Sequence, residues 1–380
     1  MPPVNDLPGR PLRVIAVRSA ELLEAHLPAW RRLVELALDR NPFFEPPMLL
    51  AAMRAFCSQR AEVALVYAPQ RQHPDAEPVL CGLFPLRTYR GRGVAMGIWT
   101  HSFAFTGTPL IRRDFATDTL HAMLDWLRDE RAVRTCRFSK LPVDSPVHRA
   151  LWSVIQRREL SYWIEDQHLR ARFERAADAE AFRQRAVPRD VRRGIARSRR
   201  QLGEQGVVGT RVLGPGDDPA PWLERFLGIE ASGWKARAGT ALQQNNEQRT
   251  FVFEALTALH ANAELAMLEL TVDGQAVAMN SALLCGDGGY YFKIAHDERW
   301  QRYSPGAVLE LEFADWLHTS TDVAWLDSCA DPNHPMIDRV WDGRRLIQTF
   351  WLATGRRFGK SLLTMLPMLR GVKRSLKTAR

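Results

Sequence analysis

The chain has 380 residues, of which 46% are hydrophobic and 25% charged, a composition typical of a globular protein whose length favours two domains. Its 52 Lys and Arg residues exceed the 43 Asp and Glu residues and give a net charge of +9, which favours anionic or phosphate-bearing partners. No apolar run of about 18 residues occurs, so no transmembrane segment is expected. The first ten residues lack the pattern of a secretory signal, and we expect a cytoplasmic protein.

The five cysteines argue against a metal site and against a disulfide framework. They are scattered along the chain, and no two of them form a C-x-x-C pair. No histidine spacing completes a zinc site. We therefore expect reduced cysteines that pack in the core, and no bound metal.

The first half of the chain predicts helices, then an antiparallel meander, then a helix and a strand. Apolar residues recur at helical spacing in two early segments, and short apolar runs bounded by turn residues follow them. The expected elements are helices at 20–38 and 48–56, strands at 62–68, 77–89 and 97–105, a helix at 115–130 and a strand at 133–139.

A charged segment at 171–212 connects the halves and is predicted to be mainly helical, ending in a strand. Its arginines recur at three- and four-residue steps, which places them near one another on a helix. This face is either simply solvated or a contact for a nucleotide-sugar, a lipid phosphate, an anionic membrane surface or tRNA. The residues concerned are Arg185, Arg189, Arg192, Arg193, Arg197 and Arg200.

The second half repeats the same order more clearly. Helices are expected at 221–232 and 249–260, followed by three strands within 264–297. Asp273-Gly274 and Gly288-Gly289 join these strands, because hairpin turns require residues that tolerate positive φ. A helix from Pro305 to Ser320 and a short buried strand at 323–329 complete the half.

The matching element order indicates an internal duplication. The tripeptide Asp125-Trp126-Leu127 recurs as Asp315-Trp316-Leu317, 190 positions later, which is half the chain length. We therefore predict an α+β fold of two tandem units, each a mixed, mostly antiparallel sheet flanked by helices. The expected division is 1–165 and 166–380.

One turn in the second half has the setting of a phosphate-binding site. Arg302-Tyr303-Ser304-Pro305-Gly306-Ala307 follows the third strand of the meander and opens directly into a helix. Backbone N–H groups and the helix dipole hold phosphate at such a position. Proline removes one donor, and the N–H groups of Gly306, Ala307 and Val308 are expected to remain available. The first half has no equivalent glycine turn.

This element order resembles the GNAT acyltransferase fold, present here as two tandem units. In that family the turn after the fourth strand binds the pyrophosphate of coenzyme A, with the signature Gln/Arg-x-x-Gly-x-Gly/Ala. The string itself occurs at 90–95, but it leads into another strand-like run and not into a helix. We interpret 90–95 as a Gly-rich hairpin and assign the donor site to the turn at 302–308.

The resemblance narrows to the CelD/BcsL group, named for cellulose and other polysaccharide biosynthesis and related to the FemABX aminoacyltransferases. The sequence is similar to that group in the order of several segments, which runs over nearly the whole chain. Two departures concern the acceptor: Arg339 stands where the group usually has Lys, and the loop CADPNHPM lacks the common glycines. The segments are NPFFEPPMLLAAM, THSFAFTGTPLI, RDVRRGIARSRRQL, EASGWKARAGTAL and YSPGAVLELE.

The resemblance implies roles for particular residues. The donor would contact Arg302, Ser304, Pro305, Gly306, Ala307 and Val308, and the backbone around Ile294 and Ala295 would stabilise the oxyanion. Asp327 would orient the acceptor amine or accept its proton, and Glu230 could serve as a base. Lys235 would contact an acidic group of the acceptor. Trp234, Arg339 and Trp341 would line its site. A turn-capping Asp327 and solvated Glu230 and Lys235 are the structural alternatives.

The function implied is N-acyl transfer from acetyl-CoA or another acyl-CoA to an amine of a sugar or envelope-glycan precursor, without a metal or a covalent intermediate. Two alternatives stay open. One is a FemABX-like aminoacyltransferase that uses aminoacyl-tRNA, which the basic charge favours. The other is a non-catalytic GNAT-like module of a polysaccharide synthesis system, which the altered donor turn keeps open.

Overall fold

The computed structural model describes residues 12–56, 61–69, 77–89, 95–232 and 242–355. These residues form two compact units, which are made of 12–46, 61–167 and 347–355 in the first and of 47–56 and 168–346 in the second. The expected boundary at 165/166 falls inside β7 (Tyr162–Glu174), a strand with residues in both units. β13 (Gly343–Ala353) also contributes to both.

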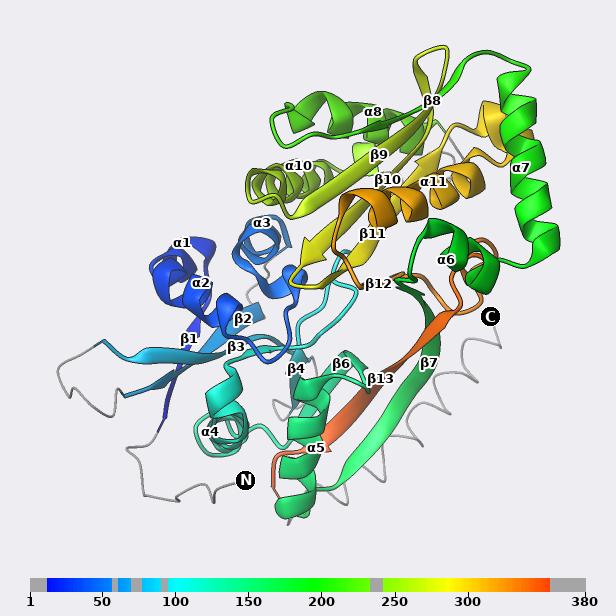
Figure 1. Cartoon of the computed structure of the whole chain (residues 1–380). Helices are drawn as coiled ribbons and strands as arrows, with labels where there is room; N and C mark the ends of the chain where they lie inside the picture. Colours follow the sequence, from blue (N-terminus) through cyan, green and yellow to red (C-terminus); the bar gives the residue numbers. More distant parts are fainter. Residues whose placement is uncertain (1–11, 57–60, 70–76, 90–94, 233–241, 356–380) are drawn as a thin grey trace, which may run out of the picture. The chain divides into compact units, whose positions relative to one another are not determined.

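The first unit is a mixed sheet with helices packed against it (Figure 1). Its strand order is β1-β2-β3-β4-β6-β13-β7, with β5 beside β3. The pairs β1·β2, β2·β3, β3·β4, β3·β5 and β6·β13 are antiparallel, and β4·β6 is parallel. The other elements are β1 (Arg13–Val17), α1 (Ala20–Glu24), α2 (Leu27–Glu35), η1 (Pro42–Phe44), β2 (Ala61–Ala68), β3 (Val79–Thr88), β4 (Ala95–Ile98), β5 (Leu110–Ile111), η2 (Arg113–Phe115), α4 (Ala116–Asp129), β6 (Thr135–Pro142) and α5 (Pro146–Arg157).

The second unit has a sheet of order β7-β12-β11-β10-β9-β8. Here β11·β12 is the parallel pair, and the pairs β7·β12, β10·β11, β9·β10 and β8·β9 are antiparallel. Its elements are α3 (Pro46–Phe56), α6 (Ala179–Ala186), α7 (Arg189–Gly203), β8 (Val208–Val212), α8 (Pro219–Ala231), η3 (Leu242–Gln244), α10 (Asn246–Ala261), β9 (Leu265–Val272), β10 (Gln275–Cys285), β11 (Gly288–His296), η4 (Glu298–Tyr303), α11 (Pro305–Ser320), β12 (Trp325–Asp327) and η5 (Ile337–Arg339).

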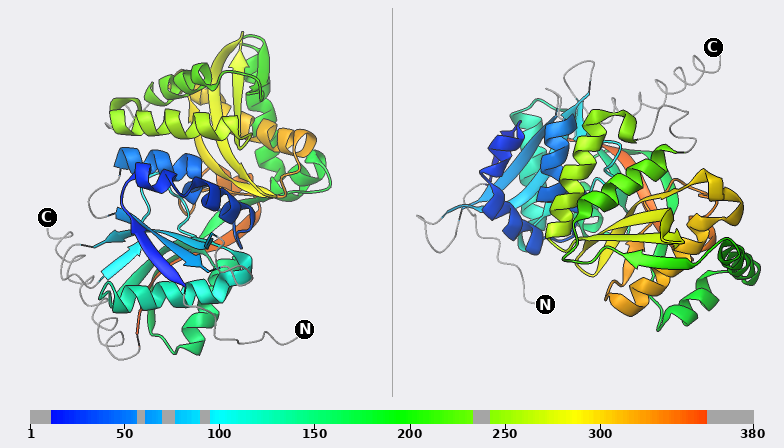
Figure 2. Two further views of the ribbon diagram at one scale, coloured as in Figure 1. Left: turned by 90° about the vertical axis from the view of Figure 1, so that its left-hand side faces the viewer. Right: turned by 90° about the horizontal axis from the view of Figure 1, so that it is seen from above.

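Both faces of the second sheet are covered, so every residue of β9 is buried. Leu268 and Leu270 share a core with Phe313 and other residues of α11. Side chains alternate between the faces of a strand, and Glu269 accordingly reaches the opposite side, where Arg225 of α8 donates to it at 3.1 Å. Figures 1 and 2 show α8 and α10 on one side of these strands and α11 on the other.

The structure shows the predicted duplication at the level of elements. In each unit, antiparallel strands lead into a helix, and the strand after the helix pairs in parallel with a meander strand before it, β6 with β4 and β12 with β11. The repeated tripeptide lies in these corresponding helices: Asp125-Trp126-Leu127 in α4 and Asp315-Trp316-Leu317 in α11. The order of elements is therefore the repeated feature that the sequence preserves most clearly.

Some predicted elements differ from the observed ones. The strand expected at 97–105 ends at Ile98, because the following residues bend and the N–H of Ala104 bonds to the carbonyl of His101. The segment expected to be a helical crossing from residue 171 begins with the end of β7 and becomes helical only at α6. β13 was not predicted, since its apolar residues resemble those of a buried helix over so short a run.

Gly288 tests the parallel pairing of β11 with β12. A Cβ at Gly288 would lie 2.1 Å from Cε2 of Trp325, its register partner. We expect Gly288→Ala to lower the free energy of unfolding by about 1–3 kcal/mol, the usual cost of overpacking. The matched control is Gly228→Ala in α8, where nothing lies within 4 Å and a gain of about 0.5–1 kcal/mol is expected. Chemical denaturation measures both, and equal effects would contradict the pairing.

Candidate active site

β11 has two neighbours of very different extent. β10 pairs with it from Gly288 to His296, whereas β12 pairs only with Gly288, Gly289 and Tyr290. β12 ends at Asp327, so β11 beyond Tyr290 has an edge that no described strand occupies. Backbone polar groups of buried strands need partners, and a substrate lying along this edge could supply them.

The hydrogen-bond pattern decides which backbone groups face the open edge. The N–H of Asp297 bonds to the carbonyl of Val277 at 2.9 Å, and Ala278 stands opposite His296. In an antiparallel ladder successive residues direct their N–H groups to opposite sides. The N–H of Ala295 therefore points toward β10 and that of Ile294 toward the open edge. Of the two predicted oxyanion donors, the geometry makes only Ile294 available.

The turn before α11 is built around Ser304. Its φ of 47° and ψ of 50° are left-handed, its side chain makes no capping hydrogen bond, and its N–H bonds to the carbonyl of Gln301 at 3.0 Å. This conformation reverses the chain between η4 and α11, and Pro305 then begins the helix. The predicted helix start at this turn is thus observed in the structure.

The number of free donors in this turn needs correction. The N–H groups of Ala307 and Val308 both bond to the carbonyl of Ser304, at 3.0 and 3.3 Å. The N–H groups of a first helical turn have no partner within the helix unless the carbonyl just before it accepts them, as the carbonyl of Ser304 does here. Of the three N–H groups expected to be available, those of Ala307 and Val308 are used within the turn, which leaves that of Gly306.

Gly306 brings the predicted donor residues together. A Cβ at this position would lie 3.6 Å from Cδ1 of Ile294, 3.7 Å from Sδ of Met336 and 3.9 Å from Nδ1 of His296. The start of α11 thus lies against the end of β11, and the loop after β12 reaches the same point. There is room for a methyl group at Gly306 but not for a large side chain. Arg302, the remaining predicted donor contact, is exposed and lies over the ring of Tyr303.

Asp327 is fully buried at the end of β12. Its Oδ1 lies 3.3 Å from Nη1 of Arg170 and accepts the N–H of Cys329 at 2.8 Å, while Oδ2 lies 3.9 Å from Nη1 of Arg345. Burial, the largest single cause, lowers the pKa of Arg170, but the Asp327 carboxylate and neighbouring groups together raise it. Asp327 therefore holds two buried guanidinium groups, and its catalytic role stays a prediction.

Glu230 is buried near the end of α8. Its Oε2 accepts the N–H of Leu242 at 3.0 Å, and its Oε1 lies 3.9 Å from Nζ of Lys293 in β11. The predicted residues Trp234 and Lys235 follow α8 and lie outside the described residues. The role of Glu230 as a base stays a prediction, and Lys293 is a neighbouring cation that the sequence did not suggest.

The predicted carboxylates and the donor turn belong to opposite faces of the sheet. Leu326 and Phe173 are in the core beneath α11, so Asp327, the next residue after Leu326, faces the other way. Tyr290, opposite Asp327 in the ladder, shares that face, and burial raises its pKa well above the usual value. Lys293 and Glu230 are on the same side. The open edge of β11 therefore lies between a donor turn on one face and two carboxylates on the other.

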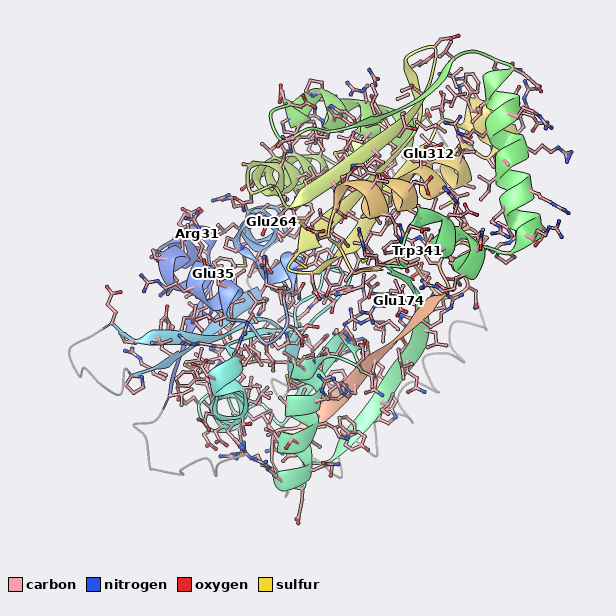
Figure 3. All side chains as sticks on the ribbon, in the orientation of Figure 1. Arg31, Glu35, Glu174, Glu264, Glu312 and Trp341 are labelled. Carbon is pink, nitrogen blue, oxygen red and sulfur yellow. The ribbon has the colours of Figure 1, made fainter. Side chains whose placement is uncertain are left out.

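The basic-aromatic pair after β12 separates in the structure. Arg339 is largely exposed and lies 3.8 Å from Asp190, an exposed ion pair of little energetic weight. Trp341 is 1% exposed and packs with Phe173 and Tyr291, whose ring centres lie 5.9 and 5.6 Å away. Figure 3 shows Trp341 beneath α11. Binding of the acceptor by these two residues stays a prediction.

The structure adds residues that sequence patterns did not identify. Arg170 and Arg345 are buried within strands β7 and β13, where no spacing rule marks them, and Met336 reaches Gly306 from a loop. No described group of three or more His, Cys, Asp or Glu side chains is arranged to hold a metal ion. In the part of the chain that the structure describes, no helix is long and apolar enough to cross a membrane.

A comparison with protein families identifies this region. Residues 189–334 match the model of the acetyltransferase (GNAT) domain, a segment that contains the open edge of β11, the turn at Ser304 and Asp327. Residues 189–334 are therefore a domain similar to the acetyltransferase (GNAT) family. The fold prediction of tandem GNAT-like units is confirmed, and the second unit contains the matched GNAT domain. No curated protein matches the sequence.

Solved structures share the fold over most of the chain. FemX has 8% sequence identity and a TM-score of 0.58, with 90% of this chain and 98% of FemX covered. A conserved protein of unknown function from Bacteroides thetaiotaomicron VPI-5482 has 13% identity and a TM-score of 0.54, with 86% and 97% covered. At such identities the likeness concerns the fold, and it extends beyond the matched GNAT domain.

Ser304 provides a test of the donor turn. A left-handed conformation is unfavourable for serine and costs glycine nothing. We expect Ser304→Gly to raise the free energy of unfolding by about 1 kcal/mol and Ser304→Val to lower it by about 1–3 kcal/mol. Ser320→Gly, in the last turn of α11, is the matched control and should cost about 0.5–1 kcal/mol. A loss on Ser304→Gly equal to that of the control would contradict the left-handed turn.

Proposed function

We propose that the protein is an N-acyltransferase of the CelD/BcsL group that moves an acyl group from acetyl-CoA or another acyl-CoA to an amine of a sugar or another cell-envelope or polysaccharide precursor. Its place of action would be the cytoplasm, where such donors are available. The observation that carries this proposal is the open edge of β11 beyond Tyr290, within the GNAT domain and beside a helix start.

The reaction would proceed by direct attack in a ternary complex. The amine nitrogen bonds to the thioester carbonyl carbon, the C–S bond breaks, and the leaving thiolate takes up a proton. The N–H of Ile294 would donate to the carbonyl oxygen as it gains negative charge. Holding the donor and the amine together supplies much of the remaining rate.

The donor would lie along the open edge, with its pyrophosphate at the start of α11. The N–H of Gly306 and the positive end of the helix dipole favour phosphate there. Arg302 and Ser304 are both exposed beside this turn and can contribute a charge and a hydroxyl. Pro305, Ala307 and Val308 would shape the contact through their backbone.

The acceptor amine would approach from the opposite face of the sheet. Glu230 would take the amine proton directly or through water, and Asp327 would orient the amine. Lys235 would contact an acidic group of the acceptor, and Trp234 would form a wall of its site. Arg339 and Trp341 are not assigned to this approach, because Trp341 packs with Phe173 and Tyr291 on the α11 side of the sheet. Lys293 adds a cation 3.9 Å from Glu230.

A second candidate is a FemABX-like aminoacyltransferase that takes its donor from aminoacyl-tRNA. The fold likeness to FemX and the arginines of α7 favour it. Arg189, Arg193, Arg197 and Arg200 recur at three- and four-residue steps, and each is exposed. In that case this surface would bind the phosphates of the nucleic acid; with an acyl-CoA donor it would serve an anionic membrane surface.

Titration calorimetry with acetyl-CoA tests the donor. We expect micromolar binding by the wild type and none by Gly306→Trp, because the indole cannot fit between Ile294 and Met336. Gly306→Ala is the matched control and should bind like the wild type, since its Cβ meets only ordinary contacts of 3.6 Å or more. A thermal unfolding curve for each variant establishes that the fold is retained.

The other outcomes separate the alternatives. If the wild type does not bind acetyl-CoA but binds aminoacyl-tRNA, the aminoacyltransferase is supported. If the wild type binds neither donor, a non-catalytic module is indicated. Equal binding by the wild type and a folded Gly306→Trp variant would remove the turn from the donor site.

Asp327→Asn tests the proposed acceptor role. We expect turnover to fall by about 100-fold or more, the usual effect of losing a residue that positions or deprotonates a substrate, with a much smaller change in donor affinity. The variant also loses a buried charge between Arg170 and Arg345 and should unfold more easily, by about 3 kcal/mol. Asp190→Asn, in an exposed pair, should change neither quantity. Undiminished turnover by folded Asp327→Asn would exclude Asp327 from the reaction.

A further inference from the structure

α11 and β11 cross with contacts at two points. Gly306 meets Ile294 at one point. One helical turn later the hydroxyl of Tyr291 donates a hydrogen bond of 2.6 Å to Oε2 of Glu310. Residues four apart lie on the same helix face, so Gly306 and Glu310 both face the strand. The ring of Phe313 also packs against Tyr291, with centres 5.6 Å apart. The Glu310–Tyr291 hydrogen bond thus joins the side chains of the two elements.

The surroundings of Glu310 are polar but uncharged. Glu310 and Asn280 are both 0% exposed, and Trp341 is 1% exposed. The indole N–H of Trp341 lies beside Glu310 and the amide of Asn280 beside Tyr291, and neither group carries a charge. Burying a carboxyl in such a setting lowers the free energy of unfolding, so its presence suggests a functional reason. An apolar residue would pack the same space more favourably.

We propose that Glu310 is a positioning residue for the donor turn, whose carboxyl joins α11 to β11 through Tyr291 and thereby sets the approach of Gly306 to Ile294. This inference rests on the proposed function, because it gives Glu310 a role in holding the donor. Glu310 does not touch the donor and acts through the first turn of α11.

The charge state of Glu310 makes this contact dependent on pH. Burial raises the pKa of Glu310 to about 7, although the neighbouring Tyr291 and Trp341 side chains lower it. The other charged residues around α11 pair away from it: Arg199 of α7 with Glu312, and Arg183 of α6 with Asp315. β11 presents Tyr291 to it, β10 presents the neutral Asn280, and the acidic Glu269 of β9 lies on the opposite face.

The sign of the effect follows from the raised pKa. In the unfolded chain the carboxyl ionises near 4.5 and in the folded protein near 7, so the folded state holds the extra proton between these values. Stability therefore falls as pH rises from about 4.5 to about 7 and is constant above that range. Above pH 7 the buried charge draws in water and loosens the start of α11 from β11, and the donor turn widens.

Acetyl-CoA affinity measured between about pH 6 and 8 tests the proposal. If only the protonated form holds the turn in place, the competent fraction falls from about 90% to about 10%, and the apparent Kd rises about tenfold. Glu310→Gln keeps the shape of the side chain and cannot ionise. Its Kd should therefore change much less between pH 6 and 8 than that of the wild type. Glu312→Gln, on the same helix but paired with Arg199, is the matched control and should follow the wild-type profile.

Each outcome decides the proposal. A Kd profile of Glu310→Gln that equals the wild-type profile overturns it while leaving the proposed function intact. Absence of acetyl-CoA binding by the wild type at every pH overturns both. If Glu310→Gln does not fold, Tyr291→Phe replaces it. This variant removes the bond between the elements, and affinity at pH 6 should fall several-fold. Unchanged affinity there would also overturn the proposal.

Discussion

The second unit depends on the unequal pairing of one strand. β11 is bonded along its whole length to β10, but β12 follows it for only three residues before ending at Asp327. A strand edge left open inside a covered sheet retains directional hydrogen-bonding groups without a permanent partner. In the proposed function, a substrate lies along that edge and meets the N–H groups that face it. The start of α11 lies on one side of the edge and the carboxylates of Asp327 and Glu230 on the other. For this reason the N–H of Ile294, and not that of its neighbour Ala295, faces the edge.

The same pairing differs in the first unit, which is predicted to have no donor turn. The first unit also has a parallel pair connected through a helix, β4·β6 with α4 between them. β4, however, ends at Ile98, one residue after its last pair with β6 at Gly97, so among the described residues almost none of it extends beyond its neighbour. The helix that follows begins after η2 without a glycine turn. The order of elements is repeated, but of the two parallel pairs that the structure describes, β11·β12 is the one in which the earlier strand extends well beyond its partner.

Sequence patterns were sufficient for the local features and insufficient for the pairings. Turn residues such as Asp273-Gly274 and the apolar stripe of the helix after Pro305 identified the meander and α11, because these signals depend on neighbouring residues. The partners of Asp327 could not be identified: Arg170 and Arg345 come from strands 157 positions before and 18 positions after it in the numbering, and nothing local marks them as buried. The number of donors at Ser304 was also overestimated, since that depends on where one carbonyl points.

Glu310 shows that a local signal can exist and still be missed. In the segment AVLELEF two glutamates stand two residues apart, and neither was assigned a role from the sequence. Helical periodicity, however, places Glu310 on the stripe of Gly306, Phe313 and Leu317, and Glu312 on the side of α7 (Figure 3). Polarity suggested exposure and periodicity suggested burial, and the structure follows periodicity.

Asp327 and Glu310 are both fully buried carboxyl groups of this unit, but their neighbours differ. Asp327 lies between two guanidinium groups on the face toward the proposed acceptor, where a fixed negative charge is balanced by fixed positive ones. Glu310 lies among a phenol, an indole and an amide on the face of α11. There, among the residues that the structure describes, no cation is paired with it, and burial raises its pKa to about 7. A phosphate-bearing donor bound at the start of α11 would be repelled by an ionised group one turn away. A carboxyl that remains neutral there can connect helix and strand without opposing the anion that the helix start attracts.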